Sequence, residues 1–323
     1  MKILIVKPSS FGDIIQANPV LAALKSTWKD CSVDWLVFKQ WKEIVKMFPA
    51  VDNIITWDRH GGMKAFSSVL KECNKQKYDL VIDLQGLLRT ALLVKMMNAK
   101  KKIGVSGMKE LSWLLVKEPY KRNKKENAVI RNLNSVSYVT GVQYTPKFDI
   151  ISESVAKDKL RNFNLSDGDD VVAFVPFSRG QTKTWDIQNY VKLAGKIKEK
   201  NKNIKILVLG ADTDYGKISS SDIVDICGKT DIEELAGVLK MCSFVVGADT
   251  GAMHLANALG VKNAFIFGGS DINETSPYGD KSKIISAYLP CSPCRGKCKF
   301  DTEKCLQQIT PEIVFENIKE WIK

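Results

Sequence analysis

The chain has 323 residues, of which 45% are hydrophobic and 26% are charged, and its formal net charge is +12. This length favours two domains, and the apolar content is sufficient for a large core. No apolar run approaches the roughly 20 residues of a membrane-spanning helix, and the run before Lys7 is too short for a signal peptide, so we expect a cytoplasmic protein.

The first half of the chain alternates strand-like apolar runs with segments of helical periodicity. The predicted strands are residues 3–6, 32–37, 53–56, 80–83 and 102–105. The predicted helices are residues 14–25, 41–48, 63–75 and 88–97. In the loop after the first strand, Gly12 permits a close backbone approach. Asp13 is placed either to cap the next helix or to act as a general base at a cleft, and both interpretations stay open.

Basic residues are concentrated between residues 95 and 125, where ten Lys or Arg stand against Glu110 and Glu118. Such a segment suits an anionic partner, namely nucleic acid, phosphorylated lipid or an acidic membrane surface. A solvated lysine-rich face is an equally good interpretation, because Lys is frequent throughout the chain. The chain lacks the interleaved basic and aromatic residues of an RRM and the histidine spacing of a zinc finger, which argues against nucleic-acid binding.

The second half of the chain repeats the alternation of strands and helices. The predicted strands are residues 171–175, 205–209, 223–226, 243–246 and 263–267. The predicted helices are residues 187–199, 232–240 and 252–259, followed by a terminal amphipathic helix over residues 311–322 that Thr310 and Pro311 introduce. A polar stretch near residues 149–170 separates the two halves.

The turn from Asp249 to Gly251 joins a predicted strand to a predicted helix that Gly260 ends. A strand that enters a helix through such a turn directs free backbone N–H groups and the helix dipole at one spot, which favours phosphate. Thr250 adds a hydroxyl, and His254 adds an imidazole one turn into the helix. The alternative is an ordinary turn in which Asp249 caps the helix.

The eight cysteines fall into two groups. Four are scattered and are expected to be ordinary core or surface thiols: Cys31, Cys73, Cys227 and Cys242. Four others follow a C-x2-C-x3-C-x6-C spacing: Cys291, Cys294, Cys298 and Cys305. This group forms either a possible structural zinc site or a purely structural loop, and the loop is favoured. A reducing cytoplasm argues against disulfides.

Strands separated by helices predict right-handed βαβ units in parallel sheets. We therefore expect an α/β protein of two doubly wound, Rossmann-like domains, residues 1–155 and 156–323, that face each other across a cleft. Ligands of such sheets bind beyond the carboxyl ends of the strands. The chain contains neither G-x-G-x-x-G nor G-x-x-x-x-G-K-[ST], which argues against a dinucleotide oxidoreductase and a P-loop NTPase.

Four segments resemble the ADP-heptose:lipopolysaccharide heptosyltransferases, glycosyltransferase family 9, which have the two-domain GT-B fold. They are residues 7–19, residues 177–185 with a Lys-x-Trp, residues 247–254 followed by 267–271, and, more weakly, residues 78–89. The opening loop is most similar to the first heptosyltransferase, which adds heptose to the Kdo of Kdo2–lipid A. The cysteine group is more similar to the second heptosyltransferase and to generic members, so a later core acceptor or another nucleotide sugar is the alternative.

The resemblance implies an inverting, metal-independent transfer from ADP-heptose, with no cofactor required. It makes Asp13 the base that takes the acceptor proton, and Lys183 the group that binds the leaving diphosphate. The residues implied for the donor are Ser178, Arg179, Lys183, Asp212, Thr230, Asp249, Thr250, Gly251 and His254. Asp214 is an alternative to Asp212. Of the tryptophans, Trp185 is the one expected near the donor.

The acceptor implied by the resemblance is an anionic glycolipid of the Kdo2–lipid A type, which carries carboxylates and phosphates. The protein would then act as a peripheral enzyme on the cytoplasmic face of the inner membrane. The residues expected on the acceptor side are Ser9, Ser10, Gly12, Arg59, Lys64, Arg89, Lys124 and Arg131. Taken singly, each of the charged residues is better explained as an ordinary surface charge, whereas as a set they suit an anionic glycolipid.

Overall fold

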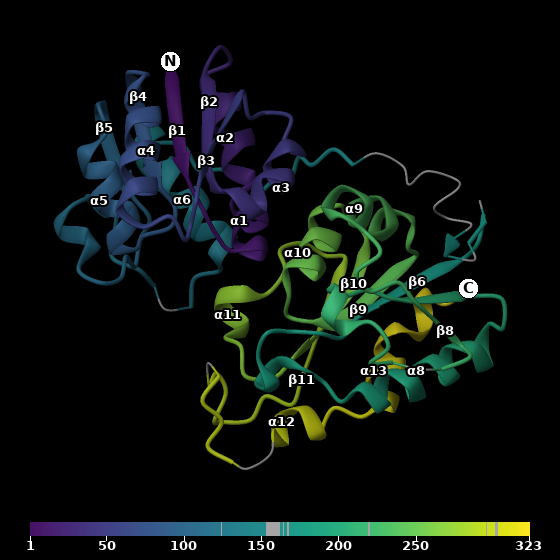
Figure 1. Ribbon diagram of the computed structural model, residues 1–323. Helices are drawn as coiled ribbons and strands as arrows, with labels where there is room; N and C mark the ends of the chain where they lie inside the picture. Colours follow the sequence, from purple (N-terminus) through teal and green to yellow (C-terminus); the bar gives the residue numbers. More distant parts are fainter. Residues whose placement is uncertain are drawn as a thin grey trace. The chain divides into compact units, whose positions relative to one another are not determined.

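The computed structural model describes every residue except 124, 153–161, 164, 167, 219, 295, 301 and 302 (Figure 1). It divides into two compact units, Met1–Ile151 and Ser152–Lys323. The predicted boundary at residues 155 and 156 lies outside the described residues. Within the described part of the chain, no helix has the length and apolar character needed to cross a membrane.

Unit 1 is built on one parallel sheet with the strand order β3-β2-β1-β4-β5. Its strands are β1 (Lys2–Val6), β2 (Ser32–Phe38), β3 (Asn53–Trp57), β4 (Tyr78–Asp83) and β5 (Ala99–Gly104). Its helices are α1 (Phe11–Ala17), α2 (Pro19–Thr27), η1 (Lys39–Trp41), α3 (Lys42–Lys46), α4 (Gly62–Asn74), α5 (Leu88–Met96), η2 (Ser112–Leu114) and α6 (Ala128–Thr140). The apolar runs that predicted the strands are buried on both faces, as parallel sheets require.

Unit 2 contains a second parallel sheet, with the order β11-β10-β9-β6-β7-β8. Its strands are β6 (Val171–Val175), β7 (Lys205–Val208), β8 (Ile223–Asp225), β9 (Phe244–Ala248), β10 (Lys262–Phe267) and β11 (Ser282–Ser286). Its helices are η3 (Gln181–Lys183), α8 (Ile187–Lys200), η4 (Asp212–Asp214), α9 (Ile232–Met241), α10 (Gly251–Ala258), α11 (Ile272–Thr275), α12 (Lys304–Gln307), α13 (Pro311–Ile318) and η5 (Lys319–Trp321). Counted from β6, this is the doubly wound order 3-2-1-4-5-6.

The predicted fold class, α/β with two doubly wound parallel sheets, is therefore confirmed, and all ten predicted strands are present within one or a few residues. The predicted helix over residues 14–25 is wrong in one respect, because it is two helices that meet at Asn18. Pro19 lacks an N–H group and occupies the first position of α2. The Asn18 side chain exchanges hydrogen bonds of 2.8 and 2.9 Å with the Asp149 backbone, which fixes the break.

Several elements were not predicted, and the two longest of them among the described residues are helix α6 and strand β11. Helix α6 begins at Asn127, whose side chain accepts from the Val129 amide at 2.9 Å, and ends at Gly141 with a φ of 75°. Strand β11 adds a parallel edge to the second sheet beside β10. In unit 2, α8 and α13 pack against each other and enclose a core with one face of the sheet. This core holds the indole of Trp185, which donates to the Ile309 carbonyl at 2.7 Å.

Gly247 lies in the middle of β9, where a side chain has no room. A Cβ atom there would stand 2.5 Å from the Val175 carbonyl oxygen of β6 and 2.8 Å from the Met253 sulfur. We expect Gly247→Ala to destabilise unit 2 by about 1–3 kcal/mol, because β9 and β6 must separate. The matched control is Gly195→Ala in α8, where nothing lies within 4 Å of the added atom. That change should stabilise the helix by about 0.5–1 kcal/mol. Urea unfolding of the two variants measures both signs, and equal midpoints would contradict the packing described for β9.

Candidate functional site

Each sheet reverses its winding direction between two central strands, and polar loops follow those strands. In unit 2 the reversal lies between β6 and β9, which are hydrogen-bonded neighbours. In unit 1 it lies between β1 and β4. Such a reversal leaves a crevice outside the carboxyl ends of the two strands, which is where open α/β sheets bind ligands. The segments singled out from the sequence lie at or directly after these four strands, namely residues 7–19, 78–89, 177–185 and 247–254.

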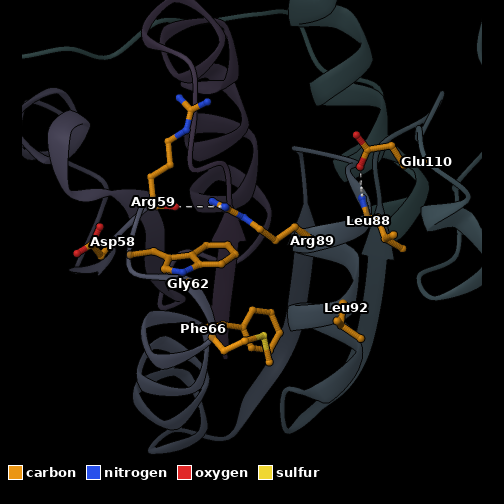
Figure 2. Close-up of a pocket in the computed structure, with 10 residues that line it drawn as sticks. Asp58, Arg59, Gly62, Phe66, Leu88, Arg89, Leu92 and Glu110 are labelled. Carbon is orange, nitrogen blue, oxygen red and sulfur yellow. Dashed lines mark hydrogen bonds between the residues drawn. The ribbon is translucent and has the colours of Figure 1, made fainter.

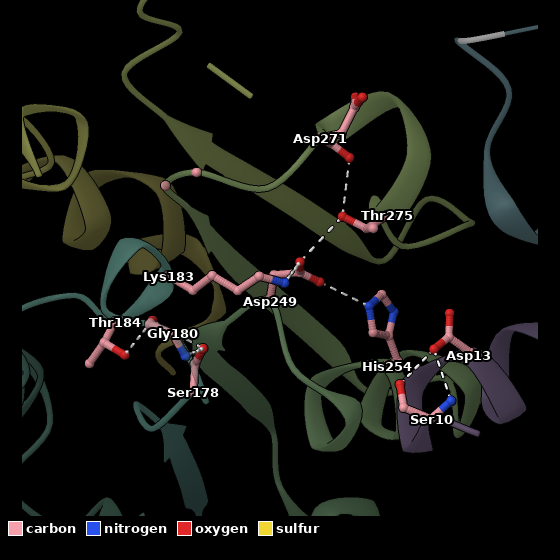
Figure 3. A network of polar contacts seen from close by, with 12 residues as sticks. Ser10, Asp13, Ser178, Gly180, Lys183, Thr184, Asp249, His254, Asp271 and Thr275 are labelled. Atoms are coloured by element: carbon pink, nitrogen blue, oxygen red, sulfur yellow. Dashed lines mark hydrogen bonds and ion pairs between the residues drawn. The ribbon is translucent and has the colours of Figure 1, made fainter. Parts of the chain in front are cut away.

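Asp249 is the centre of a polar network in unit 2 (Figure 3). One of its carboxylate oxygens, Oδ2, lies 2.8 Å from Lys183 Nζ and accepts from Thr275 Oγ1 at 3.3 Å. The other, Oδ1, lies 3.1 Å from His254 Nε2. Burial alone would raise the pKa of Asp249, but the hydrogen bond from His254 and the charge of Lys183 hold that pKa well below its usual range. The site therefore keeps a buried carboxylate ionised.

The interpretation of Asp249 as a helix cap is wrong. The N-cap of α10 is Thr250, whose backbone is extended and whose side chain makes no capping hydrogen bond. The Thr250 hydroxyl oxygen is buried and has no hydrogen-bond partner within the described residues. A buried hydroxyl of this kind, beside the unpaired N–H groups of a helix N-terminus, fits an oxygen-rich anion that supplies the missing acceptor.

The loop after β6 carries Lys183 to this network. Ser178 Oγ accepts from the Gly180 amide at 3.3 Å, and the Gly180 carbonyl accepts from Lys183 N at 3.0 Å and Thr184 Oγ1 at 3.2 Å. The loop after β10 packs directly against it, because Gly269 N donates to the Thr182 carbonyl at 2.8 Å. A side chain at Gly268 would stand 2.2 Å from that same oxygen. The two glycines therefore allow the close contact that fixes the position of Lys183.

The other predicted donor residues lie along the same edge of the sheet. Asp212 follows β7 and is exposed, and Thr230 follows β8 just before the N-cap of α9. The two loops touch, since a Cβ on Gly228 would stand 2.5 Å from the Asp212 Cα. Arg179 is exposed in the β6 loop and has no ion pair among the residues that the structure describes. Together these residues extend from the β6–β9 reversal across the carboxyl ends of β7 and β8.

In unit 1, Asp13 forms a capping box at the start of α1. Its Oδ2 accepts from the Ser10 backbone N–H at 3.0 Å and from the Ser10 hydroxyl at 2.5 Å. The N-cap is Ser10, and Asp13 is the third residue of the helix. The capping interpretation is thus confirmed in this modified form, and it fixes where the carboxylate lies. The hypothesis that Asp13 acts as a general base stays a prediction.

Two charged side chains are buried at the reversal of unit 1: Lys7, which directly follows β1, and Asp83, the last residue of β4. Lys7 Nζ donates to the Leu84 carbonyl at 2.9 Å. Burial lowers the pKa of Lys7, while the charges of Asp13 and Asp83 oppose that change and Arg131 adds to it. Burial raises the pKa of Asp83 to about 6, although Gly86 N, Thr90 Oγ1 and Gln85 N all donate to its carboxylate. These contacts tie the loops after β1 and β4 together.

The predicted acceptor residues of unit 1 divide into two sets. Ser9, Ser10, Gly12 and Arg131 lie around Asp13, and Ser9 N donates to Gln85 Oε1 at 3.3 Å. Arg59 and Arg89 lie together further along the edge, where the Arg89 guanidinium carbon stands 4.4 Å from the Trp57 ring centroid. Lys64 is exposed on α4, and Lys124 lies outside the described residues.

The structure places Trp185 and the scattered cysteines in the core. Trp185 is wrong as a donor contact, because its exposed fraction is 0% and its indole packs edge-on against Tyr190. The four scattered cysteines are buried, as expected of core thiols. Burial raises the pKa of Cys305, and the nearby thiols of Cys294 and Cys291 add to the effect. Within the described residues no group of three or more His, Cys, Asp or Glu is placed to hold a metal ion.

Sequence reasoning missed Lys7 and Thr275 as members of these networks. Lys7 carried a signal, because a lysine directly after a buried strand ends at the functional edge of the sheet. No pattern in the sequence indicated Thr275. It lies at the end of the short helix α11, and only the folding of the chain brings it to Asp249. Its hydroxyl also contacts the Asp271 carbonyl at 3.1 Å.

Comparison with known proteins identifies the family. The model of Glycosyltransferase family 9 (heptosyltransferase) matches residues 66–304. Lipopolysaccharide heptosyltransferase 1 of Pseudomonas aeruginosa is 28% identical over 92% of this chain and 87% of its own. Lipooligosaccharide heptosyltransferase 2 of Campylobacter jejuni is 26% identical over 99% of each.

A similar fold occurs in a solved structure, E. coli heptosyltransferase WaaC with ADP-2-deoxy-2-fluoro heptose. Its TM-score to this chain is 0.76, with 24% identity over 99% of both chains. The family match covers most of the sequence, including the β4 loop, the Lys183 loop and the Asp249 turn. This chain therefore belongs to glycosyltransferase family 9, the heptosyltransferase family, and is a glycosyltransferase.

Proposed function

We propose that this protein transfers heptose from ADP-L-glycero-D-manno-heptose to the Kdo of Kdo2–lipid A, in the synthesis of the lipopolysaccharide inner core. The observation that carries the donor half is the network at the β6–β9 reversal. There the Lys183 ammonium, the buried Thr250 hydroxyl, which has no partner in the described part of the chain, and a helix N-terminus lie together. These groups are complementary to a diphosphate.

Lys183 and α10 stabilise the leaving group in this proposal. When the bond between the anomeric carbon and the diphosphate oxygen breaks, its electron pair and negative charge stay on ADP. An ammonium has three donors, and Asp249 takes one of those of Lys183, which leaves two for phosphate oxygens. Preorganised donors at the position where charge develops lower the barrier without reorganisation. His254 acts as a positioning residue, because its ring bonds to Asp249 rather than facing solvent.

Asp13 is the proposed base. Inversion requires the acceptor oxygen to attack the anomeric carbon from the face opposite the diphosphate, and its proton must pass to a carboxylate on that side. The capping box fixes Asp13 at the end of β1, on the edge of unit 1 where a ligand would bind. In this proposal the donor cradle belongs to unit 2 and the base belongs to unit 1.

No metal or cofactor is required in this mechanism, since Lys183 and the α10 N-terminus provide the charge that a divalent cation would otherwise supply. Asp249 is the carboxylate next to the cradle, and it is already engaged by Lys183, His254 and Thr275. A carboxylate whose oxygens are occupied in this way is a poor ligand for Mg²⁺.

The acceptor in this proposal is an anionic glycolipid, which places the protein at the cytoplasmic face of the inner membrane. Basic side chains along the edge of unit 1 support it, because Arg59, Arg89 and Arg131 all lie near the carboxyl ends of the strands. A later core acceptor is the alternative, and the full-length similarity to a heptosyltransferase 2 favours it. The proposed transfer is not expected to involve nucleic acid.

The two acceptors are separated by assaying the purified protein with ADP-heptose and either Kdo2–lipid A or the same glycolipid already carrying one heptose. We expect ADP release and a one-heptose mass increase with Kdo2–lipid A. Turnover with the heptosylated glycolipid alone would assign the protein to the later step. If the protein releases no ADP with either acceptor, both assignments are contradicted.

The Asp13→Ala change tests the base. We expect turnover to fall by about a hundredfold or more, since general base catalysis contributes roughly 10²–10⁴. The Kd for ADP should change little, because Asp13 belongs to the other unit from the donor cradle. The matched control is Asp30→Ala, which removes an exposed carboxylate. Wild-type turnover in the Asp13 variant would remove this residue from the mechanism.

The Lys183→Gln change tests the cradle. A hydrogen bond to a charged group contributes about 1.5–3 kcal/mol, so the Kd for ADP should rise about tenfold to a hundredfold. Lys192→Gln, on the exposed side of α8, serves as the control. Calorimetric titration with ADP measures both variants, and adenosine provides a ligand without phosphate. An equal loss of adenosine binding would show that Lys183 does not act through the diphosphate.

A further inference from the structure

Helix α5 exposes an apolar stripe. Leu88, Leu92 and Met96 recur every fourth residue and are 45%, 42% and 51% exposed, while Leu93 and Val94 on the same helix are buried. A surface helix of a globular domain normally carries polar residues on its outer face. Helix η2 packs against α5 and continues the surface with three more exposed apolar residues, Leu111, Trp113 and Leu114. Packing in the core of unit 1 therefore does not explain why these exposed residues are apolar.

A pocket of about 510 Å³ opens beside this stripe, between α4 and α5. Its walls are mainly apolar and comprise Trp57, Met63, Phe66, Leu88 and Leu92. Figure 2 shows Phe66 of α4 and Leu92 of α5 on two sides of the opening. Met63 is 81% exposed at its edge. The volume falls within the roughly 300–1,000 Å³ typical of small-molecule sites.

The rim of the pocket carries two arginines. The Arg89 guanidinium stacks on Trp57 and lies 4.9 Å from the Phe38 ring centroid, and it donates to the Arg59 carbonyl at 3.4 Å. Within the described residues, neither Arg59 nor Arg89 has a carboxylate within ion-pair distance. Burial and the neighbouring Arg59 charge both lower the pKa of Arg89, so an anion placed between the two would relieve their repulsion.

Two carboxylates also line the rim, but both are engaged elsewhere. Glu110 Oε2 accepts from the Leu88 amide at 3.1 Å and so caps the start of α5. Asp58 Oδ1 accepts from the His60 amide at 3.0 Å, and its Oδ2 lies 3.8 Å from Lys39 Nζ. The rim thus presents two guanidiniums above an apolar cavity. This combination matches a molecule with an anionic head and a hydrocarbon tail.

We propose that an acyl chain of the anionic glycolipid acceptor occupies the α4–α5 pocket, with its phosphate or carboxylate held by Arg59 and Arg89. The inference rests on the proposed function, because it makes this pocket the lipid half of the acceptor site. The exposed stripe of α5 then lies against the remaining hydrocarbon of the same lipid. The enzyme recognises a lipid-linked acceptor by its tail as well as by its sugar.

The first test measures chain binding without any sugar transfer. Wild-type protein is titrated in a calorimeter with inorganic phosphate, butyl phosphate and dodecyl phosphate, the last below its micelle concentration. We expect dodecyl phosphate to bind at least about tenfold more tightly than butyl phosphate, because burial of each CH₂ is favourable. Leu92→Glu and the more exposed Met63→Glu should each abolish this difference. Ile313→Glu, at a 44% exposed site on α13, is the matched control and should keep it.

The second test uses the transfer reaction. The KM for acylated Kdo2–lipid A is compared with that for the same acceptor stripped of its acyl chains, in wild-type protein and in the Leu92→Glu variant. We expect a KM at least about tenfold lower for the acylated form in wild type, and no such ratio in the variant.

The two tests separate the inference from the proposed function. Equal binding of butyl and dodecyl phosphate overturns the pocket assignment, whether or not heptose is transferred. Chain-length-dependent binding that Leu92→Glu abolishes supports the pocket even if Kdo2–lipid A is not a substrate, and then only the proposed function fails. Self-association of the wild-type protein that Leu92→Glu removes, without chain-length dependence, would instead make the stripe an interface between two copies.

Discussion

The buried carboxylate of Asp249 is the interaction on which the donor half of this protein depends. Its charge is tolerated only because Lys183 and His254 contact its two oxygens. Removing either partner would weaken the stabilisation of a buried charge, so the network links the loop after β6, the turn after β9, α10 and α11. The same contacts hold the Lys183 ammonium at the N-terminus of α10. In our proposal, stability and donor recognition therefore depend on the same few atoms.

Unit 1 uses the same topological position in a different way. Its sheet also reverses between two central strands, and Lys7 and Asp83 are buried there, whereas the Lys183 side chain at the reversal of unit 2 is 37% exposed. The loop that follows Lys7 leads to the capping box of Asp13 at the start of α1. In our proposal one unit provides donors for an anionic leaving group, and the other provides a fixed carboxylate and a basic, partly apolar edge. In our proposal this division of labour assigns the nucleotide to unit 2 and the lipid-linked sugar to unit 1.

Much of the fold could be predicted from the sequence, because buried parallel strands form continuous apolar runs and the turns between them carry polar residues. The order of the strands could not, so the contact between the Lys183 loop and Asp249 had no local signal. The strand β11 was missed because an edge strand is buried only in part and its run is short. Trp185 was misassigned because the family pattern places it two residues after Lys183, whereas the η3 turn sends its indole into the core.

The pocket between α4 and α5 could not be predicted from the sequence either. The basic residues Arg59 and Arg89 were visible as charges in the sequence, but the apolar cavity beneath them depends on how α4 and α5 pack. Apolar residues at a spacing of four predicted a helix and gave no indication that one of its apolar faces would stay uncovered. An exposed apolar stripe next to guanidiniums becomes apparent only when the helix has been placed on the sheet.

The central claim is that the turn between β9 and α10, together with Lys183, binds the diphosphate of the donor. A crystal structure of the protein with ADP measures this directly. The account predicts phosphate oxygens within hydrogen-bond distance of Lys183 Nζ, the Thr250 hydroxyl and the first amides of α10. ADP bound elsewhere, with the Thr250 hydroxyl still lacking a partner, would contradict it.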